Sequence, residues 1–202
     1  MMHSNFIITG FGRSGTKFLA SKLNQSPSWK VNHEAIINKL IQDDSQTEID
    51  SIQSQFNGVN NYGEVNSYAR ECLLNIDVSK KALLLRNPRD IIISSYNWNN
   101  QTLSNVRIDQ IEAGFKALDR LIESGIKCFL FERMIDSIDY IQSIANYVGI
   151  DDLQLSGDDL KPINSSQKHV VKTYDDLPLN IKIRCTGFMM WFENKYISFW
   201  NE

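Results

Sequence analysis

Short apolar runs alternate along the chain with longer segments whose apolar residues recur at helical spacing. The apolar runs predict strands over residues 5–10, 29–32, 81–86 and 126–132. The periodic segments predict helices over residues 15–25, 88–98, 108–123, 133–148 and 180 to the end. This alternation is typical of an α/β fold with a central, mainly parallel sheet flanked by helices.

Two polar segments interrupt the pattern. Residues 43–63 are rich in Gln, Asn and Ser, and we expect part of this segment to be a helix and part a loop over a site. Residues 151–176 are similarly polar, contain Pro162 and show little periodicity. Neither segment is long or repetitive enough to be a linker or a second domain, so 202 residues predict one domain spanning residues 1–202.

Composition narrows the class of protein. The chain has 42% hydrophobic and 22% charged residues and a formal net charge of −3, which argues against a general nucleic-acid binder but not against a local anion site. Cys72, Cys128 and Cys185 form no CxxC pair and are expected to be buried free thiols rather than zinc ligands. No apolar stretch approaches the roughly 18 residues of a membrane span, so we expect a cytoplasmic protein without one.

The stretch "FIITGFGRSGTKFL" places a glycine-rich loop directly after the first predicted strand. Glycines allow a tight bend that turns backbone N–H groups inward, and the following helix N-terminus favours an anion, so the loop predicts phosphate binding. Gly10 and Gly15 have Walker A separation, but Thr16 and Lys17 invert its lysine–hydroxyl order. The strand in "KALLLRNPRD" ends with Arg86 rather than an acidic metal ligand, so a magnesium-dependent kinase stays an alternative only.

A second stretch, "LLLRNPRDIIISSYNW", places Arg86 at a strand end, Pro88 at a helix start and Ser94 two turns into that helix. The two stretches together resemble the nucleotide-binding signatures of sulfotransferases that use 3′-phosphoadenosine-5′-phosphosulfate (PAPS). The resemblance implies a P-loop-type three-layer fold and extends from Asn5 to the C-terminal helix.

The resemblance also implies roles for matching positions. The 5′-phosphosulfate of PAPS would be surrounded by residues of the first loop and helix start: Gly12, Arg13, Ser14, Gly15, Thr16 and Lys17. Arg86 and Ser94 would bind the 3′-phosphate, and two anionic ends of one nucleotide do need two cationic sites. Arg13 takes the place of a lysine that is catalytic in many members, so Arg13 and Lys17 are expected to stabilise the leaving 5′-phosphate.

Weaker similarities continue along the chain. "CFLFERMID" resembles a strand that ends in an aromatic–Glu pair, so Phe131 and Glu132 are expected to tie the strand end to neighbouring loops. "INSSQKHV" resembles a late loop that covers the nucleotide, which makes Asn164, Ser165 and Ser166 further nucleotide candidates. The late GxxGxxK element of cytosolic members is absent, so the chain resembles the GRSGT-type branch more closely.

Sulfuryl transfer requires a base for the acceptor's proton and positive charge near the leaving oxygen, and it requires no metal. "KVNHEAI" supplies Glu34, in a position similar to that of a glutamate base in GRSGT-type members, with His33 as the rival base. Glu34 as a helix cap is the structural alternative. Glu64 in "NYGEVNSYAR" precedes a helical run and is a candidate to orient the acceptor or to serve as the base instead, while Arg70 is expected to form a salt bridge.

The nature of the acceptor leaves no motif. A glycan or small metabolite with a hydroxyl or amine is the expected acceptor, with no nucleic-acid partner. Four aromatic residues are expected to be core rather than binding residues: Tyr62, Tyr68, Tyr96 and Trp98. Besides the sulfotransferase and the kinase, a module that binds the nucleotide without turnover stays open.

Overall fold

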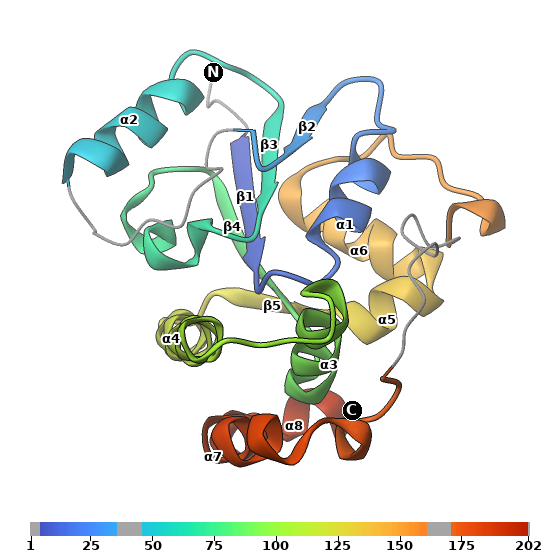
Figure 1. The fold of residues 1–202 in the computed structure, drawn as a ribbon. Helices are drawn as coiled ribbons and strands as arrows, with labels where there is room; N and C mark the ends of the chain where they lie inside the picture. Colours follow the sequence, from blue (N-terminus) through green and yellow to red (C-terminus); the bar gives the residue numbers. More distant parts are fainter. Residues whose placement is uncertain (1–4, 36–45, 161–170, 202) are drawn as a thin grey trace.

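Five parallel strands form the centre of the protein in a computed structural model that describes residues 5–35, 46–160 and 171–201 (Figure 1). The strands are β1 (Asn5–Gly10), β2 (Lys30–His33), β3 (Tyr62–Asn66), β4 (Lys80–Leu85) and β5 (Lys127–Leu130), in the spatial order β2-β3-β1-β4-β5. β1 pairs with β3 on one side and β4 on the other, so the central strand is buried along its whole length. The α/β class with a parallel sheet flanked by helices is therefore confirmed.

Helices cover both faces of this sheet (Figure 1). The longer ones are α1 (Thr16–Leu23), α2 (Gln46–Phe56), α3 (Pro88–Trp98), α4 (Asn105–Glu123), α6 (Ile138–Val148) and α7 (Leu179–Lys195). The shorter ones are α5 (Phe131–Asp136), α8 (Ser198–Asn201) and the 3-10 turns η1 (Ala69–Glu71), η2 (Leu73–Asn75), η3 (Gly157–Leu160) and η4 (Tyr174–Asp176).

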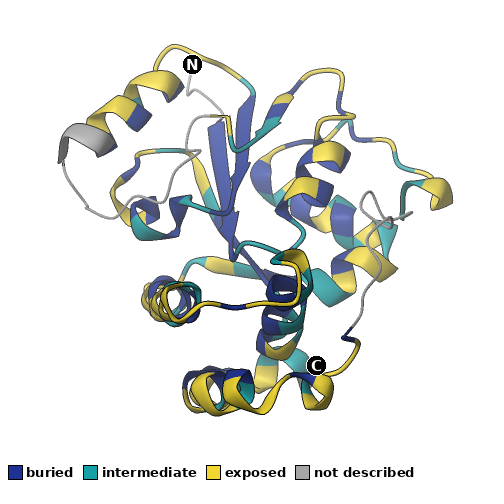
Figure 2. Ribbon diagram, viewed as in Figure 1, coloured by how far each residue is buried: buried dark blue, intermediate teal, exposed yellow. Residues whose placement is uncertain are grey.

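Alternation along the strands divides the core into two clusters. Phe6 and Ile8 of β1 pack with α1 and α6, while Ile7 packs on the opposite face with residues of α2, α3 and α4. β1 and β3 are buried along their whole length, whereas the edge strands β2 and β5 and the outer sides of the helices are partly exposed (Figure 2). Helix α7 packs on α3 and α4 as a further layer outside the sheet.

Several predicted boundaries were wrong for local reasons. β3 was not predicted, because Glu64 and Asn66 hide its apolar pattern; the residues after it form 3-10 turns rather than a long helix. The predicted strand 126–132 stops at Leu130. The predicted helix 133–148 is two helices, since Ser137 is extended with φ −144° and its hydroxyl caps α6.

The cysteines and aromatic residues follow the prediction in part. All three cysteines are free thiols; Cys72 and Cys185 are buried, and Cys128 is half-buried. Tyr62 and Tyr96 lie in the core as expected. Trp98 does not, because half of its surface, 51%, is exposed at the end of α3.

Candidate active site

The described strands are parallel, so the residues that follow β1, β2, β3 and β4 meet at one edge of the sheet. The connection after β1 leads into α1 on one face, and the connection after β4 leads into α3 on the other. Adjacent strands whose connections diverge open a crevice between them, which is where open α/β sheets bind ligands. Residues 11–15, the glycine-rich loop, lie at this point.

The glycine-rich loop is held in shape by its own residues. The Ser14 hydroxyl and backbone N–H both donate to the Phe11 carbonyl, at 2.6 and 3.0 Å. A Cβ on Gly10 would lie 2.5 Å from the Leu84 carbonyl oxygen, so the loop leaves the sheet too close to β4 for any side chain. Ser14, predicted to bind phosphate, is fully buried with its hydroxyl turned into the loop, while Gly12 faces open space.

Gly15 begins α1 with φ 83°, a left-handed conformation that favours glycine. A Cβ there would lie 2.5 Å from Phe131 Cε2. Phe131 also lies beneath Arg86, whose guanidinium carbon is 4.5 Å from the ring centroid, and Glu132 accepts a 2.8 Å bond from the Asn87 N–H. The expectation that Phe131 and Glu132 tie the strand end to neighbouring loops is confirmed.

The two sequence motifs meet at Arg13. Its Nε donates to Ser94 Oγ at 3.1 Å, and Arg86 Nη1 donates to the Arg13 carbonyl oxygen at 2.7 Å. The Arg13 guanidinium stacks 4.3 Å above the ring of Trp98, an exposed residue that the sequence analysis assigned to the core. Arg13, Arg86 and Ser94, far apart in sequence, thus form one cationic group.

In the part of the chain that the structure describes, no ion pair balances the positive charge of this cationic group. Burial lowers the pKa of Arg13 and the nearby Arg86 lowers it further; burial also lowers the pKa of Arg86, opposed by Asp90 and Glu132. Among the described residues, no carboxylate lies within ion-pair distance of either guanidinium, and Arg86 Nε is buried without a hydrogen-bond partner. Two close arginines with an unmet donor are suited to an oxyanion with more than one charge.

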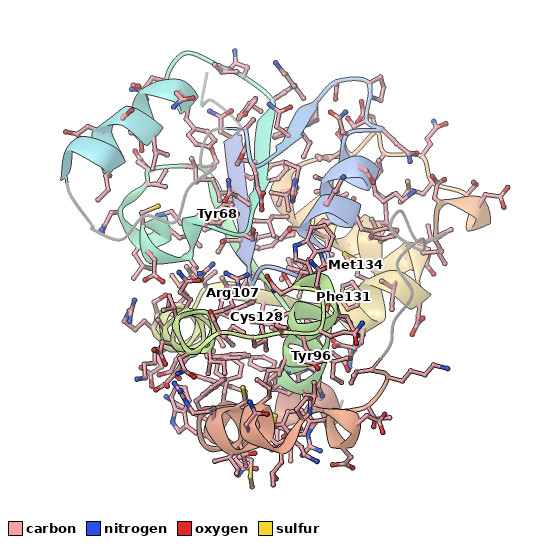
Figure 3. The ribbon with its side chains drawn as sticks, in the orientation of Figure 1. Tyr68, Tyr96, Arg107, Cys128, Phe131 and Met134 are labelled. Carbon is pink, nitrogen blue, oxygen red and sulfur yellow. The ribbon has the colours of Figure 1, made fainter. Side chains whose placement is uncertain are left out.

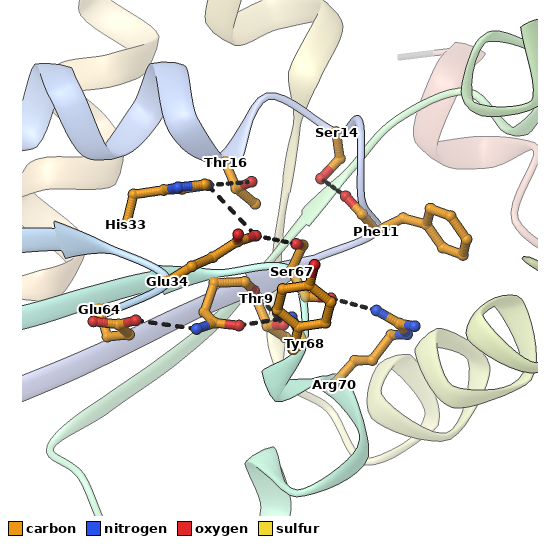
Figure 4. Close-up of polar contacts among 11 residues, drawn as sticks. Thr9, Phe11, Ser14, Thr16, His33, Glu34, Glu64, Ser67, Tyr68 and Arg70 are labelled. Atoms are coloured by element: carbon orange, nitrogen blue, oxygen red, sulfur yellow. Dashed lines mark hydrogen bonds and ion pairs between the residues drawn. The ribbon is translucent and has the colours of Figure 1, made fainter. Parts of the chain in front are cut away.

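A second polar group lies on the other side of the loop, at the ends of β2 and β3 (Figure 4). His33 Nε2 is 3.2 Å from Thr16 Oγ1 and 3.6 Å from Glu34 Oε1. The Ser67 hydroxyl donates to Glu34 Oε1. Burial lowers the pKa of His33; the Glu34 carboxylate opposes this shift and Lys17 adds to it, so the neutral imidazole is favoured near pH 7.

Glu34 itself is a partly exposed carboxylate outside any helix. Its side chain is 25% exposed, its φ is 55°, and its backbone N–H donates to the Val65 carbonyl at 3.3 Å. The carboxylate contacts His33 and Ser67; the helix expected to start near Glu34 would lie outside the described residues. Lys17, in the first turn of α1, is exposed and close enough to His33 to affect its pKa.

Glu64 is not part of either group. It lies in the middle of β3, fully buried, and accepts bonds from the Tyr62 hydroxyl at 3.2 Å and the Asn66 amide at 3.0 Å. Figure 4 shows it separated from Glu34 by the strand. The further candidates Asn164, Ser165 and Ser166 lie outside the described residues.

Two participants were missed from the sequence. Ser67 positions Glu34, and its only signal was its place directly after "GEVN", in a strand that was not predicted. The Trp98 ring stacks against the Arg13 guanidinium. The sequence feature that could have indicated an exposed Trp98 is the polar run "NNQT" that follows it. In the described ranges, no group of three His, Cys, Asp or Glu residues is placed to hold a metal ion, and no helix is both long and apolar enough to span a membrane.

Comparison with known proteins gives structural but not sequence matches. No protein-family model and no curated protein matches the chain. The sulfotransferase domain of an olefin synthase from Synechococcus PCC 7002 is similar in structure, with a TM-score of 0.56 over 95% of this chain and 95% of that chain, at 13% identity. A sulfotransferase from Alicyclobacillus acidocaldarius gives a TM-score of 0.54 over 98% of this chain and 96% of that one, at 18% identity. The chain therefore has the α/β fold seen in these two sulfotransferases.

Proposed function

We propose that the protein transfers a sulfuryl group from PAPS to a hydroxyl group of a small-molecule or glycan acceptor. The observation that carries the proposal is the meeting of Arg13, Arg86 and Ser94 beside the glycine-rich loop. A nucleotide with a 3′-phosphate and a 5′-phosphosulfate has two anionic ends, which match the two arginines and the loop N–H groups. The shared fold with two sulfotransferases supports the same assignment.

Arg86 and Ser94 would bind the 3′-phosphate. Arg86 has a buried Nε without a partner, and an oxyanion would accept its hydrogen bond. Ser94 Oγ accepts a bond from Arg13 Nε, and a bound phosphate oxygen could take its place as the acceptor. Gly12, Gly15, Thr16 and Lys17 would surround the 5′-phosphosulfate, because they line the loop and the first turn of α1. Ser14 would help by holding the loop closed.

Glu34 would act as the base. The acceptor oxygen forms a bond to sulfur while Glu34 takes the hydroxyl proton, and the bond from sulfur to the 5′-phosphate oxygen breaks with its electron pair passing to that phosphate. Arg13 and Lys17 stabilise the charge that develops there. His33, neutral and next to both Thr16 and Glu34, would keep the carboxylate oriented and is the alternative base.

The test is a calorimetric titration with 3′-phosphoadenosine-5′-phosphate (PAP), the product nucleotide, with and without magnesium. We expect magnesium-independent binding that weakens at least about tenfold in Arg86→Ala, since a charge-assisted bond contributes roughly 1.5–3 kcal/mol. Arg89→Ala is the matched control: it removes an equal charge from the first turn of α3, close to Arg86 in the sequence, where Arg89 pairs with Glu193 at 3.1 Å. Binding of ATP only with magnesium, and no binding of PAP, would replace the proposal with a kinase.

A further inference from the structure

Three arginines gather beside the candidate site, and two of them pair with the same carboxylate. Glu71 Oε2 lies 2.9 Å from Arg120 Nη2, and Glu71 Oε1 lies 3.7 Å from Arg70 Nε. Arg107 adds a third charge, close enough to lower the pKa of Arg70, and donates to Gln110 Oε1 at 3.1 Å. Within the described part of the chain, no carboxylate is within ion-pair distance of Arg107. The group therefore has an excess of positive charge.

Two of these arginines have buried donors that nothing satisfies. Arg70 is 6% exposed, and the predicted salt bridge to Glu71 exists but is too long for a hydrogen bond. The Nε atoms of both Arg70 and Arg107 are buried without a hydrogen-bond partner. Buried donors on a charged group are normally paired, and the cost of leaving them unpaired falls when an oxyanion binds.

The location links this pair to the acceptor side of the site. Arg70 Nη1 donates to the Ser67 carbonyl, and the Ser67 hydroxyl donates to Glu34, so only one residue separates Arg70 from the proposed base (Figure 4). Arg107 lies near the start of α4 (Figure 3) and lines an open groove of about 450 Å³, which Arg70 does not line. Trp98, on whose ring Arg13 stacks, lines the same groove.

We propose that the acceptor carries, besides the hydroxyl group that is sulfated, an anionic group, a carboxylate or a phosphate, that Arg107 binds in this groove, where the charge of Arg70 adds to the attraction. This inference rests on the proposed sulfotransferase function and names its class of acceptor. The anion would lie in the groove next to Trp98, with the hydroxyl directed towards Glu34 and the loop. Bidentate guanidinium contacts fit either oxyanion.

The probes are 6-hydroxyhexanoate, 6-hydroxyhexyl phosphate and the uncharged methyl 6-hydroxyhexanoate, each titrated into protein saturated with PAP. The readout is the ¹H–¹⁵N signal of the arginine Nε–H groups, with Arg70 and Arg107 assigned from Arg→Lys variants. We expect a saturable shift of the Arg107 signal with at least one anionic probe, and none with the ester. Comparing the two anionic probes identifies carboxylate or phosphate as the preferred group.

Arg107→Gln should weaken the binding of the anionic probe about tenfold or more, because it removes a charge-assisted contact. Arg120→Gln is the control, since Arg120 is 60% exposed and carries the same charge in the same cluster. The inference is overturned if neither anionic probe shifts the Arg107 signal, if the ester shifts it equally, or if Arg120→Gln weakens binding as much as Arg107→Gln. Failure of PAP to bind, with the shifts retained in free protein, would instead overturn the sulfotransferase proposal and leave an anion site.

Discussion

Arg13 and Glu34 both hold backbone conformations that residues other than glycine rarely adopt, with φ of 78° and 55°. Such positions persist only where the surrounding structure imposes them, and they gather at functional sites. Here the surroundings are visible: Arg86 holds the Arg13 carbonyl, and the Val65 carbonyl holds the Glu34 N–H. Both residues have a role in the proposed reaction: Arg13 stabilises the leaving phosphate, and Glu34 accepts the proton of the acceptor.

Replacing Glu34 with glutamine should lower kcat about 10²–10⁴-fold, because the amide keeps the shape of the side chain but cannot accept a proton. The affinity for PAP, measured by calorimetry, should stay within a factor of about two. The reason is that Glu34 does not contact the residues proposed to bind the nucleotide directly; His33 lies between it and Thr16. The rate is measured as PAP released from PAPS with any hydroxyl compound that the wild type sulfates.

Ser67→Ala is the companion variant, because it removes the hydroxyl that orients Glu34 and leaves the carboxylate in place. A several-fold loss of kcat with an unchanged KM for PAPS would mark Ser67 as a positioning residue. A Glu34→Gln variant that retains wild-type kcat would exclude Glu34 as the base and direct attention to His33.

His33 gives the protein a pH dependence whose sign follows from its surroundings. Burial, the largest cause, and Lys17 lower its pKa below the ordinary 6.5 despite Glu34, so the unfolded chain binds a proton more readily than the folded one. The stability contributed by neutral His33 is present above pH 6.5 and is lost as the pH falls through the lowered pKa. Urea unfolding at a series of pH values should show this loss in the wild type and a flatter profile in His33→Gln; identical profiles would count against the lowered pKa.

At the scale of elements, the glycine-rich loop depends on one close contact. Gly15→Ala should lower the free energy of unfolding by about 2–4 kcal/mol, because the methyl group meets the Phe131 ring and the left-handed φ disfavours any side chain. Chemical denaturation measures the loss.

Gly12→Ala is the matched control in the same loop, since a Cβ there meets nothing within 4 Å. Its free energy of unfolding should change by no more than about 0.5 kcal/mol. Equal losses in the two variants would mean that the loop does not pack on Phe131 as described.

Elements whose signals are local were predictable from the sequence. β1 and α3 have the predicted bounds, since β1 is continuously apolar and α3 begins with Asn87 as cap and Pro88 in its first turn. β3 was not, because Glu64 and Asn66 make it look polar; the Glu64 carboxylate accepts bonds from the Tyr62 hydroxyl and the Asn66 amide, and the Asn66 amide oxygen accepts one from the Tyr68 N–H, so both polar side chains are satisfied inside the protein. Position 63 in this strand requires glycine, because a Cβ there would lie 2.1 Å from Phe6 Cζ.

Site residues were predictable where a sequence motif identifies the residue and also its position at the end of a strand or in a helix. Arg13, Arg86 and Ser94 follow from the order of two signatures, and the structure brings them together. Ser67, Trp98 and the Arg70–Arg107 pair were not predictable as a site, because each depends on which loops the sheet order places side by side. Charge spacing along the chain contains no record of that order.

At the scale of the whole molecule, one crossing of the chain creates the proposed donor site. β2 and β3 lie on one side of the central strand β1, and β4 and β5 lie on the other. The connection from β3 to β4 therefore crosses from one side of β1 to the other. The glycine-rich loop and the β4–α3 connection therefore meet across the gap between β1 and β4. Each brings one arginine, so the two guanidinium groups together favour a ligand with more than one negative charge.

The measurement that tests this account most directly compares the affinities of PAP and adenosine 5′-monophosphate, which differ only in the 3′-phosphate. If Arg86 and Ser94 bind that phosphate, PAP should bind about 100-fold more tightly, since two charge-assisted contacts contribute roughly 1.5–3 kcal/mol each and part of this offsets desolvation. Equal affinities for the two nucleotides would contradict the account, because the cationic group at the β1–β4 crevice would then have no part in recognising the donor.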